Sequence, residues 1–228
     1  YSKEYHSGLT LLNNRIKGAI ESILYSTPSV GSSPEQIKLK GNTFSDFSSN
    51  AMSFSSLGDS LVLDSNTVLK TQATGYGIYT NNCGHVLIKN NMLRGSASYN
   101  SGIYTVANDK AYIYNNVLNG AFAAGIYSGS DSSFIYYNTI NNTAGNGINC
   151  GSSSEKLKIY NNIIRSSGSA CYFVNTTLVS NALIDHNDHT TTGTNLLTVG
   201  GTNYSTLSAF QSATNKDLNS LSIDPQFT

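Results

Sequence analysis

Apolar and polar residues alternate in short runs that recur along the chain. Segments with the pattern aliphatic-x-aliphatic-x-x-Asn align eight times, at intervals of 22 to 28 residues. The aligned asparagines are Asn14, Asn42, Asn66, Asn91, Asn116, Asn138, Asn162 and Asn187. Three residues before them stand Leu11, Leu39, Leu63, Ile88, Ile113, Ile135, Ile159 and Ile184. Aliphatic residues at every second position, with variable residues between them, predict a β-strand with one buried face.

Each repeat continues with two further strands. An apolar residue stands two positions after most of the aligned asparagines, and a motif of the type Gly-Ile-Tyr follows. The residues of this third strand that we expect to point inward are Met52, Ile78, Ile103, Ile126, Ile148 and Cys171. Three short strands per repeat, without a helical period, predict one coil of a parallel β-helix. We expect the asparagines to take the left-handed corner conformation and to hydrogen-bond to one another between coils.

The repeats predict an all-β, single-stranded parallel β-helix of about eight coils. We assign residues 1–189 to the coils and residues 190–228 to a loop and short helix packed on the rod, within the same domain. A helix is expected at residues 205–214, because Leu207 and Phe210 share a face and Ser205 or Thr206 can cap it.

Composition narrows the possible partners. Thirteen Lys and Arg balance thirteen Asp and Glu, and charged residues make up only 11% of the chain. Without a basic cluster, nucleic acid and anionic membranes are not expected as partners. No apolar run is long enough to cross a bilayer, so membrane insertion is not expected either. Three cysteines argue against a disulfide framework; we place Cys150 and Cys171 in the core and Cys83 in a loop, where its exposure is left open.

The repeats at 86–93, 111–118 and 157–164 resemble those of the right-handed parallel β-helix, pectate-lyase-like superfamily. Residues 184–195 and 222–228 are similar to the closing segment of bacterial secreted and cell-surface members. The resemblance implies an extracellular or cell-surface location, a polysaccharide or cell-surface glycan as ligand, and a longer parent chain of which this segment is a part.

Polysaccharide lyases in this superfamily use carboxylates to hold calcium and an Arg or Lys as the base, on the outer face of the third strand. The corresponding positions here are Ser53, Tyr79, Tyr104, Tyr127, Asn149 and Tyr172. Calcium needs six to eight oxygen ligands and glycoside hydrolysis needs two carboxyl groups, which these residues do not supply. The sequence therefore favours a non-catalytic structural or adhesive module of a larger protein, without a cofactor. A polysaccharide lyase or glycoside hydrolase with catalytic residues outside this segment remains the alternative.

The outward tyrosines themselves form a candidate carbohydrate-binding surface, because Tyr combines an apolar ring with a polar tip. Its members are Tyr79, Tyr104, Tyr127, Asn149 and Tyr172. The alternative is that the rings stack on one another and stabilise the sheet, as expected for Tyr114, Tyr136 and Tyr160 on another face. The sequence leaves both interpretations open.

Four residues near the end of the repeats have the chemistry of metal ligands. Asp185, His186, Asp188 and His189 stand within five positions, and carboxylate and imidazole groups suit zinc or another transition metal. Neighbours along a strand and its corner point in different directions, so we favour a role in the turn and predict no metal site.

Overall fold

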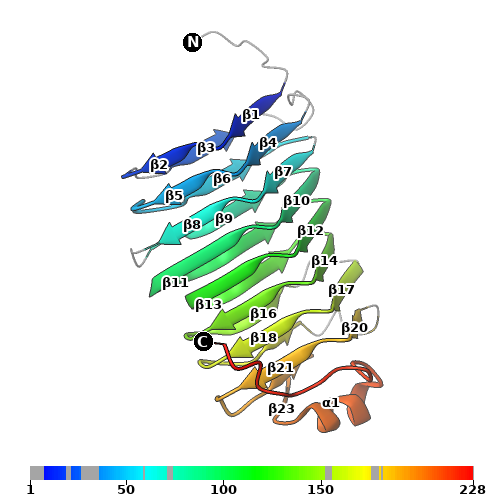
Figure 1. Ribbon diagram of the computed structural model, residues 1–228. Helices are drawn as coiled ribbons and strands as arrows, with labels where there is room; N and C mark the ends of the chain where they lie inside the picture. Colours follow the sequence, from blue (N-terminus) through cyan, green and yellow to red (C-terminus); the bar gives the residue numbers. More distant parts are fainter. Residues whose placement is uncertain are drawn as a thin grey trace.

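The computed structural model describes residues 8–18, 22–26, 36–58, 60–70, 74–151, 156–175, 180 and 182–227. Its strands stack as successive coils, with the first coil at one end and the helix α1 (Leu207–Thr214) at the other (Figure 1). The predicted parallel β-helix is confirmed by the register of the strands. The predicted helix is present, with Thr206 as its N-cap.

One face of the rod is an eight-stranded parallel sheet, here called sheet 1, which holds one strand for each asparagine repeat. Its strands are β1 (Leu9–Leu12), β4 (Ile37–Lys40), β7 (Leu61–Asp64), β10 (His85–Lys89), β12 (Lys110–Tyr114), β14 (Ser132–Tyr136), β17 (Lys156–Tyr160) and β20 (Leu183–Asp185). The register aligns the predicted aliphatic column from Leu11 to Ile184 without a slip.

The other two faces belong to a fifteen-stranded sheet, here called sheet 2, because two long strands run across both faces. The strands after the asparagine corner are β2 (Arg15–Lys17), β5 (Thr43–Ser45), β8 (Thr67–Lys70), β11 (Met92–Val106), β13 (Val117–Gly129), β15 (Thr139–Asn142), β18 (Ile163–Ser166) and β21 (Asp188–Thr191). The third face adds β3 (Ile23–Ser26), β6 (Met52–Ser55), β9 (Tyr76–Asn81), β16 (Asn146–Cys150), β19 (Tyr172–Val174), β22 (Leu197–Val199) and β23 (Thr202–Tyr204) to the second halves of β11 and β13.

The aligned asparagines form the predicted ladder inside the rod. Each side-chain oxygen from Asn42 to Asn187 accepts hydrogen bonds from the backbone and side-chain nitrogens of the ladder asparagine one coil before it, at 2.8 to 3.1 Å. Buried amides must be hydrogen-bonded to avoid a large desolvation cost, and the ladder meets this need.

We expected the ladder asparagine itself to adopt the left-handed conformation at the corner. In the structure the residue before it does so instead. Positive φ angles occur at Asn13, Gly41, Ser65, Asn90, Asn115, Tyr137, Asn161 and His186. The chain turns from one face of the coil to the next at this exposed or partly exposed position, and the following asparagine points inward. We call these eight positions the corner column.

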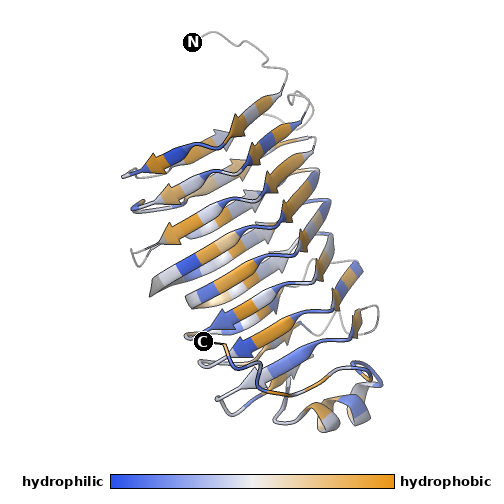
Figure 2. Ribbon diagram, in the orientation of Figure 1, coloured by the Kyte–Doolittle hydropathy of each residue, from blue (hydrophilic) through white to orange (hydrophobic). Residues whose placement is uncertain are grey.

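The core is a continuous cluster of aliphatic and aromatic side chains that runs the length of the rod, and apolar and polar residues alternate along the strands (Figure 2). Glycines let the coil close around it. A Cβ atom on Gly102 would lie 2.8 Å from both the carbonyl oxygen of Gly125 and Cδ2 of Leu118. A glycine at this point therefore allows the third strand to lie close to the next coil.

The last coil is covered by the C-terminal segment. Phe210 of α1 is fully buried, and the chain after α1 pairs with the last coil through a parallel bridge between Leu221 and Asp188. Ser220 takes the place of a ninth ladder residue, because its hydroxyl accepts the backbone N–H of Asn187 at 2.7 Å. Figure 1 shows the segment then rising along the rod towards its C-terminus.

Candidate functional site

Three tyrosines stack on one outer face of the rod. The rings of Tyr79 and Tyr104 are 5.6 Å apart at 7°, and those of Tyr104 and Tyr127 are 4.4 Å apart at 8°. They occupy matched positions on β9, β11 and β13, one per coil. We call these three residues the tyrosine strip. The sequence placed them together correctly.

The stacking decides what the tyrosine strip presents to a ligand. Nearly parallel rings on successive coils direct their faces at each other, so the outward surface consists of ring edges and hydroxyl groups. Burial and the neighbouring phenols raise the pKa of Tyr104 to about 12. Its hydroxyl therefore remains protonated at neutral pH and can donate a hydrogen bond.

A fourth tyrosine, Tyr76, lies beside the tyrosine strip, and the sequence did not predict its position. The ring of Tyr76 lies 5.3 Å from that of Tyr79 and 4.6 Å from that of Tyr104, tilted by 36° and 41°. Burial, with the nearby phenol of Tyr79, raises the pKa of Tyr76. The position is Ser, Ala or Asn in the next three coils, so the repeat gave no signal for an aromatic group there.

The structure corrects the last predicted member of this surface. Asn149 follows Tyr127 in the outward column as expected, but the next residue in that column is Phe173. Tyr172 instead pairs with Ile148, is fully buried, and donates a hydrogen bond from its hydroxyl to Asp217. The slip of one residue also moves Cys171 out of the inward isoleucine column. Tyr172 is therefore not available to a ligand.

A second group of aromatic residues lies on the outer side of sheet 1. Tyr136 stacks between Tyr114 and Tyr160, with ring separations of 5.0 Å and 5.2 Å and angles of 3° and 12°. Beside them Tyr112 stacks on Phe134 at 4.7 Å. Cross-strand aromatic pairs of this kind stabilise a sheet, as the sequence predicted for this face.

The four residues with metal-ligand chemistry do not gather at one point, although Nδ1 of His186 lies 3.4 Å from Oδ2 of Asp185. His189 is buried and bonded to Asp217, whereas the side chain of His186 is 59% exposed at the corner. Asp185 accepts hydrogen bonds from the backbone and side chain of Asn219. Within the described ranges, no three His, Cys, Asp or Glu side chains gather as a metal site.

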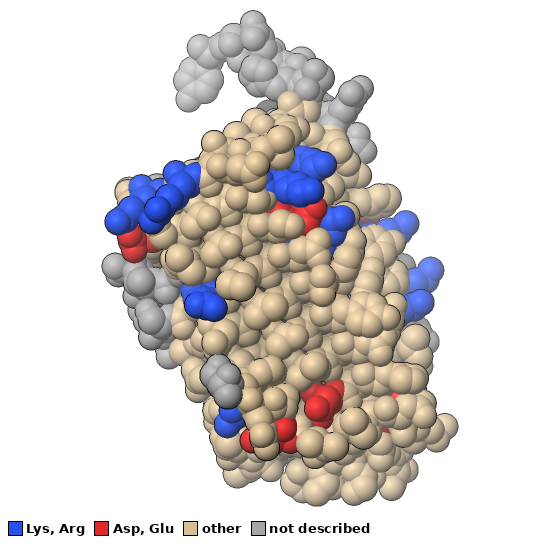
Figure 3. Space-filling view, in the orientation of Figure 1, with Lys and Arg blue, Asp and Glu red and all other residues tan. Residues whose placement is uncertain are grey.

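The described charged side chains are sparse on the face shown in Figure 3, and several form pairs. Asp64 lies between Lys89 and Lys40, at 4.0 Å and 3.9 Å. Burial alone would raise the pKa of Asp64, but hydrogen bonds from Asn90 and Ser65 and the two lysine charges lower it overall.

Two carboxylates lie in register on adjacent coils, and the sequence did not predict them as site residues. Asp109 and Asp131 each precede a strand of sheet 1, and the pairing of Lys110 with Ser132 sets them one coil apart. Both residues are exposed. The signal in the sequence was an Asp directly before the strand in two successive repeats.

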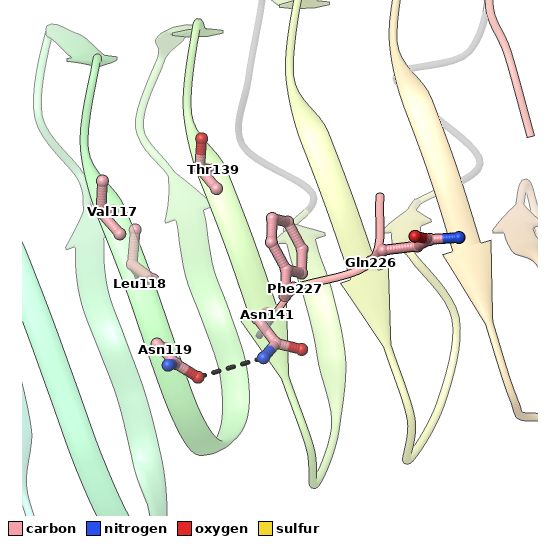
Figure 4. Close-up of a pocket in the computed structure, with 7 residues that line it drawn as sticks. All are labelled: Val117, Leu118, Asn119, Thr139, Asn141, Gln226 and Phe227. Carbon is pink, nitrogen blue, oxygen red and sulfur yellow. Dashed lines mark hydrogen bonds between the residues drawn. The ribbon is translucent and has the colours of Figure 1, made fainter. Parts of the chain in front are cut away.

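The C-terminal segment forms a hollow on the outer side of sheet 2. Phe227 reaches the sheet beside Asn141 and faces a hollow that Val117 and Thr139 also line (Figure 4). A hydrogen bond of 3.1 Å from Asn141 to Asn119 forms part of its wall. The hollow is shallow, and no ionisable side chain lines it.

The three cysteines are free and buried. Burial of Cys83 settles the exposure that the sequence left open. Burial raises the pKa of all three thiols, to about 12 for Cys150 and Cys171. They therefore behave as small core residues. None of the described helices has the length and apolar character required to span a bilayer.

Comparison with known families agrees with this architecture. Residues 30–209 match the family described as the right handed beta helix region, which covers most of the chain. No curated protein and no solved structure matches the chain significantly. The repeat, the parallel register and the family match lead to one conclusion: the chain belongs to the right-handed β-helix family.

Proposed function

We propose that the chain is a non-catalytic structural or adhesive module of a larger extracellular or cell-surface protein, and that its tyrosine strip binds a polysaccharide. The observation that carries the proposal is the stack of Tyr79, Tyr104 and Tyr127, which lines up three phenol groups on one outer face. Successive coils are about 4.8 Å apart. This spacing is close to the length of one sugar unit in an extended glycan.

The chemistry of the surface favours a glycan bound through its hydroxyl groups. Each phenol can donate and accept a hydrogen bond, and the amide of Asn149 continues the same column. Because ring faces are occupied by neighbouring rings, contact with a sugar would run along the edges. The partly exposed rings keep the geometry of the row fixed, which reduces the entropy lost on binding.

Binding can be tested by affinity electrophoresis in gels that contain hydroxyethyl cellulose or pectin. Replacing Tyr79, Tyr104 and Tyr127 together by Phe preserves the stack and removes the hydroxyls, so we expect retardation by the polysaccharide to be lost. The matched control replaces Tyr112 and Tyr114 by Phe on sheet 1 and should remain retarded. If the triple Phe variant and a Tyr104→Ala, Tyr127→Ala variant both migrate like the wild type, the glycan role is wrong and a spacer role remains.

The modular and extracellular parts of the proposal need a different measurement. An immunoblot of source cells and medium should detect the segment in a species far larger than 24.4 kDa, at the cell surface or in the medium. An intracellular species near 24.4 kDa would contradict both parts.

Asp109 and Asp131 favour a second candidate function, glycoside hydrolysis. Retaining glycosidases place two carboxyl groups about 5 Å apart, which is close to the separation of adjacent coils. Both residues are exposed, however, whereas the general acid in that chemistry is a desolvated carboxyl group. Release of reducing sugar that disappears in Asp109→Asn and in Asp131→Asn would establish this function over the first.

A further inference from the structure

One position of the corner column differs from all the others. Asn, Gly, Ser and His occupy seven of these left-handed positions, but Tyr137 occupies the eighth, with φ of 56°. Asn and Gly adopt this conformation at low cost, whereas a bulky side chain with positive φ is an outlier. Folding would be served better by Asn at position 137, so the presence of tyrosine calls for another explanation.

The ring of Tyr137 is also oriented differently from the stacked rings beside it. It lies at 82° to Tyr136 and at 70° to Tyr160, with centroid separations of 5.7 Å and 6.4 Å. Tyr136 and Tyr160 are stacked 5.2 Å apart, which leaves no room for a third ring edge between them. Tyr137 therefore lies across their edges. One of its faces is against the stack and the other is directed to solvent.

This exposure distinguishes Tyr137 from the tyrosine strip. Tyr137 is 56% exposed, whereas Tyr79, Tyr104 and Tyr127 are all partly buried. An open ring face is the part of a tyrosine that can pack against the C–H face of a ligand. The strip offers edges, and Tyr137 offers a face.

Polar groups continue from Tyr137 along the same corner. Asn161 and His186 occupy the next two positions of the corner column, each about 4.8 Å further along the rod. A hollow at these two positions is lined by Asn161, His186, Asp188 and Asn219, with Ile163 and Leu221 as its apolar walls, and Tyr137 stands in the corner column one coil before Asn161. Amide, imidazole and carboxylate groups thus lie within two coils of an open aromatic face.

The orientation of these polar groups is fixed by the C-terminal segment. The backbone and side chain of Asn219 both donate to Asp185, at 2.8 Å. The backbone N–H of His186 donates to the same carboxylate at 2.9 Å, which holds the corner beside it. The hollow is therefore formed by two segments, distant in sequence, that are tied together at Asp185.

The charge of the hollow selects among possible ligands. Its lining contains the carboxylate of Asp188 and the imidazole of His186, and no Lys or Arg. Phosphates and uronic acids would face a carboxylate without a cation to bind them. A neutral pyranose matches better, because it combines an apolar C–H face with hydroxyl groups that can bond to amide and carboxylate oxygens.

We propose that Tyr137, Asn161 and His186 form a second saccharide site, separate from the tyrosine strip, which binds a neutral pyranose with its C–H face on the ring of Tyr137. The site is on the asparagine corner between sheet 1 and the strands β15, β18 and β21, whereas the tyrosine strip is on the third face of the rod. The inference does not depend on glycan binding by the strip.

The test measures binding of cellotetraose and tetra-N-acetylchitotetraose to the full chain by saturation-transfer difference NMR, with tetragalacturonate as the charged comparison and choline as a cationic probe. We expect a neutral tetrasaccharide to bind and tetragalacturonate and choline not to bind. Tyr137→Asn should lower the affinity at least tenfold while raising Tm, because Asn suits the left-handed corner. Tyr137→Phe keeps the ring, so its affinity for the tetrasaccharide should stay within about threefold of that of the wild type.

Comparison with the strip variant makes the result specific. The triple Phe variant at positions 79, 104 and 127 should retain the Tyr137-dependent binding. If that variant loses tetrasaccharide binding while Tyr137→Asn retains it, the strip alone binds glycan and the second site is wrong. Failure of both neutral tetrasaccharides to bind the wild type, or binding of choline alone, would also overturn the site.

Discussion

His189 and Asp217 form a fully buried pair at the closed end of the rod, with 2.8 Å between Nε2 of His189 and Oδ2 of Asp217. The hydroxyls of Tyr172 and Ser220 donate to the same carboxylate. Burial alone would raise the pKa of Asp217, but the hydrogen bond and charge of His189, with the two hydroxyls, lower it overall. One carboxylate thus joins β19 and β21 to the C-terminal segment.

Asp217→Asn should destabilise the closed end of the rod. The amide cannot accept as many hydrogen bonds as the carboxylate, and it leaves buried donors of Tyr172 and His189 without a charged acceptor. Breaking a buried pair in this way typically costs about 3 kcal/mol. We expect a loss of roughly that size in the free energy of unfolding, measured by urea denaturation at pH 7. Asp224→Asn, an exposed carboxylate in the same segment, should change it by less than about 0.5 kcal/mol.

The same carboxylate gives the protein a defined dependence on acid. Because the pKa of Asp217 is lower in the folded chain, its contribution to stability is complete above its unfolded value of about 4. It is lost as the pH falls below that value towards the folded pKa. We therefore expect the difference in unfolding free energy between wild type and Asp217→Asn to shrink as the pH falls below about 4. A difference that does not change down to pH 2 would contradict the assignment of the ionised form.

The pair also marks the boundary of what the sequence could predict. The repeat predicted the aliphatic column and the asparagine ladder, because both recur in every coil. His189 stands two positions after Asn187, where most repeats have an apolar residue, and the structure keeps it in register with Ile164 and buried. A buried histidine needs a partner, and that partner is 28 residues further along the chain in a segment outside the repeat. No spacing rule could locate it.

The tyrosine strip shows the same limit on the candidate site. Tyr79, Tyr104 and Tyr127 follow the Gly-Ile-Tyr motif and were placed correctly. Tyr172 ends the corresponding motif Ala-Cys-Tyr, but the chain before it slips by one position and turns it inward, where it bonds to Asp217. In a strand, a slip of one residue exchanges the two faces. The orientation of Tyr137 likewise depends on a corner angle that residue type did not predict.

Replacing a ladder asparagine should lower the free energy of unfolding most in the middle of the rod. Asn116 accepts from both nitrogens of Asn91 at 3.0 Å and donates to Ile88 and Asn138 at 3.0 Å. Asn116→Ala leaves several buried polar groups without a partner, at about 1 to 3 kcal/mol for each group that stays unsatisfied. We expect at least about 3 kcal/mol of destabilisation in urea unfolding.

Asn14, at the other end of the ladder, provides the matched control. It is exposed and donates to Asn42 at 3.0 Å, so water can replace the lost contact. Asn14→Ala should therefore cost less than about 1 kcal/mol. Equal losses at the two positions would show that the ladder stabilises by side-chain size rather than by buried hydrogen bonds.

Gly102→Ala tests how closely the third strand can approach the next coil. The added Cβ would lie 2.8 Å from the carbonyl oxygen of Gly125 and 2.8 Å from Cδ2 of Leu118. The side chain of Leu118 can rotate. The carbonyl of Gly125, however, is part of the paired backbone of β11 and β13 and cannot move without breaking hydrogen bonds between the strands. We expect a destabilisation of about 1 to 3 kcal/mol in urea unfolding.

A double-mutant cycle with Leu118→Ala separates the two contacts. If the backbone contact dominates, Leu118→Ala will not rescue Gly102→Ala, and the two losses will add to within about 0.5 kcal/mol. If the side chain of Leu118 causes the clash, the double variant will be more stable than that sum by 1 kcal/mol or more. The first result would show that the spacing between the two coils requires glycine at position 102. The alignment of Tyr104 on Tyr127 depends on the same spacing.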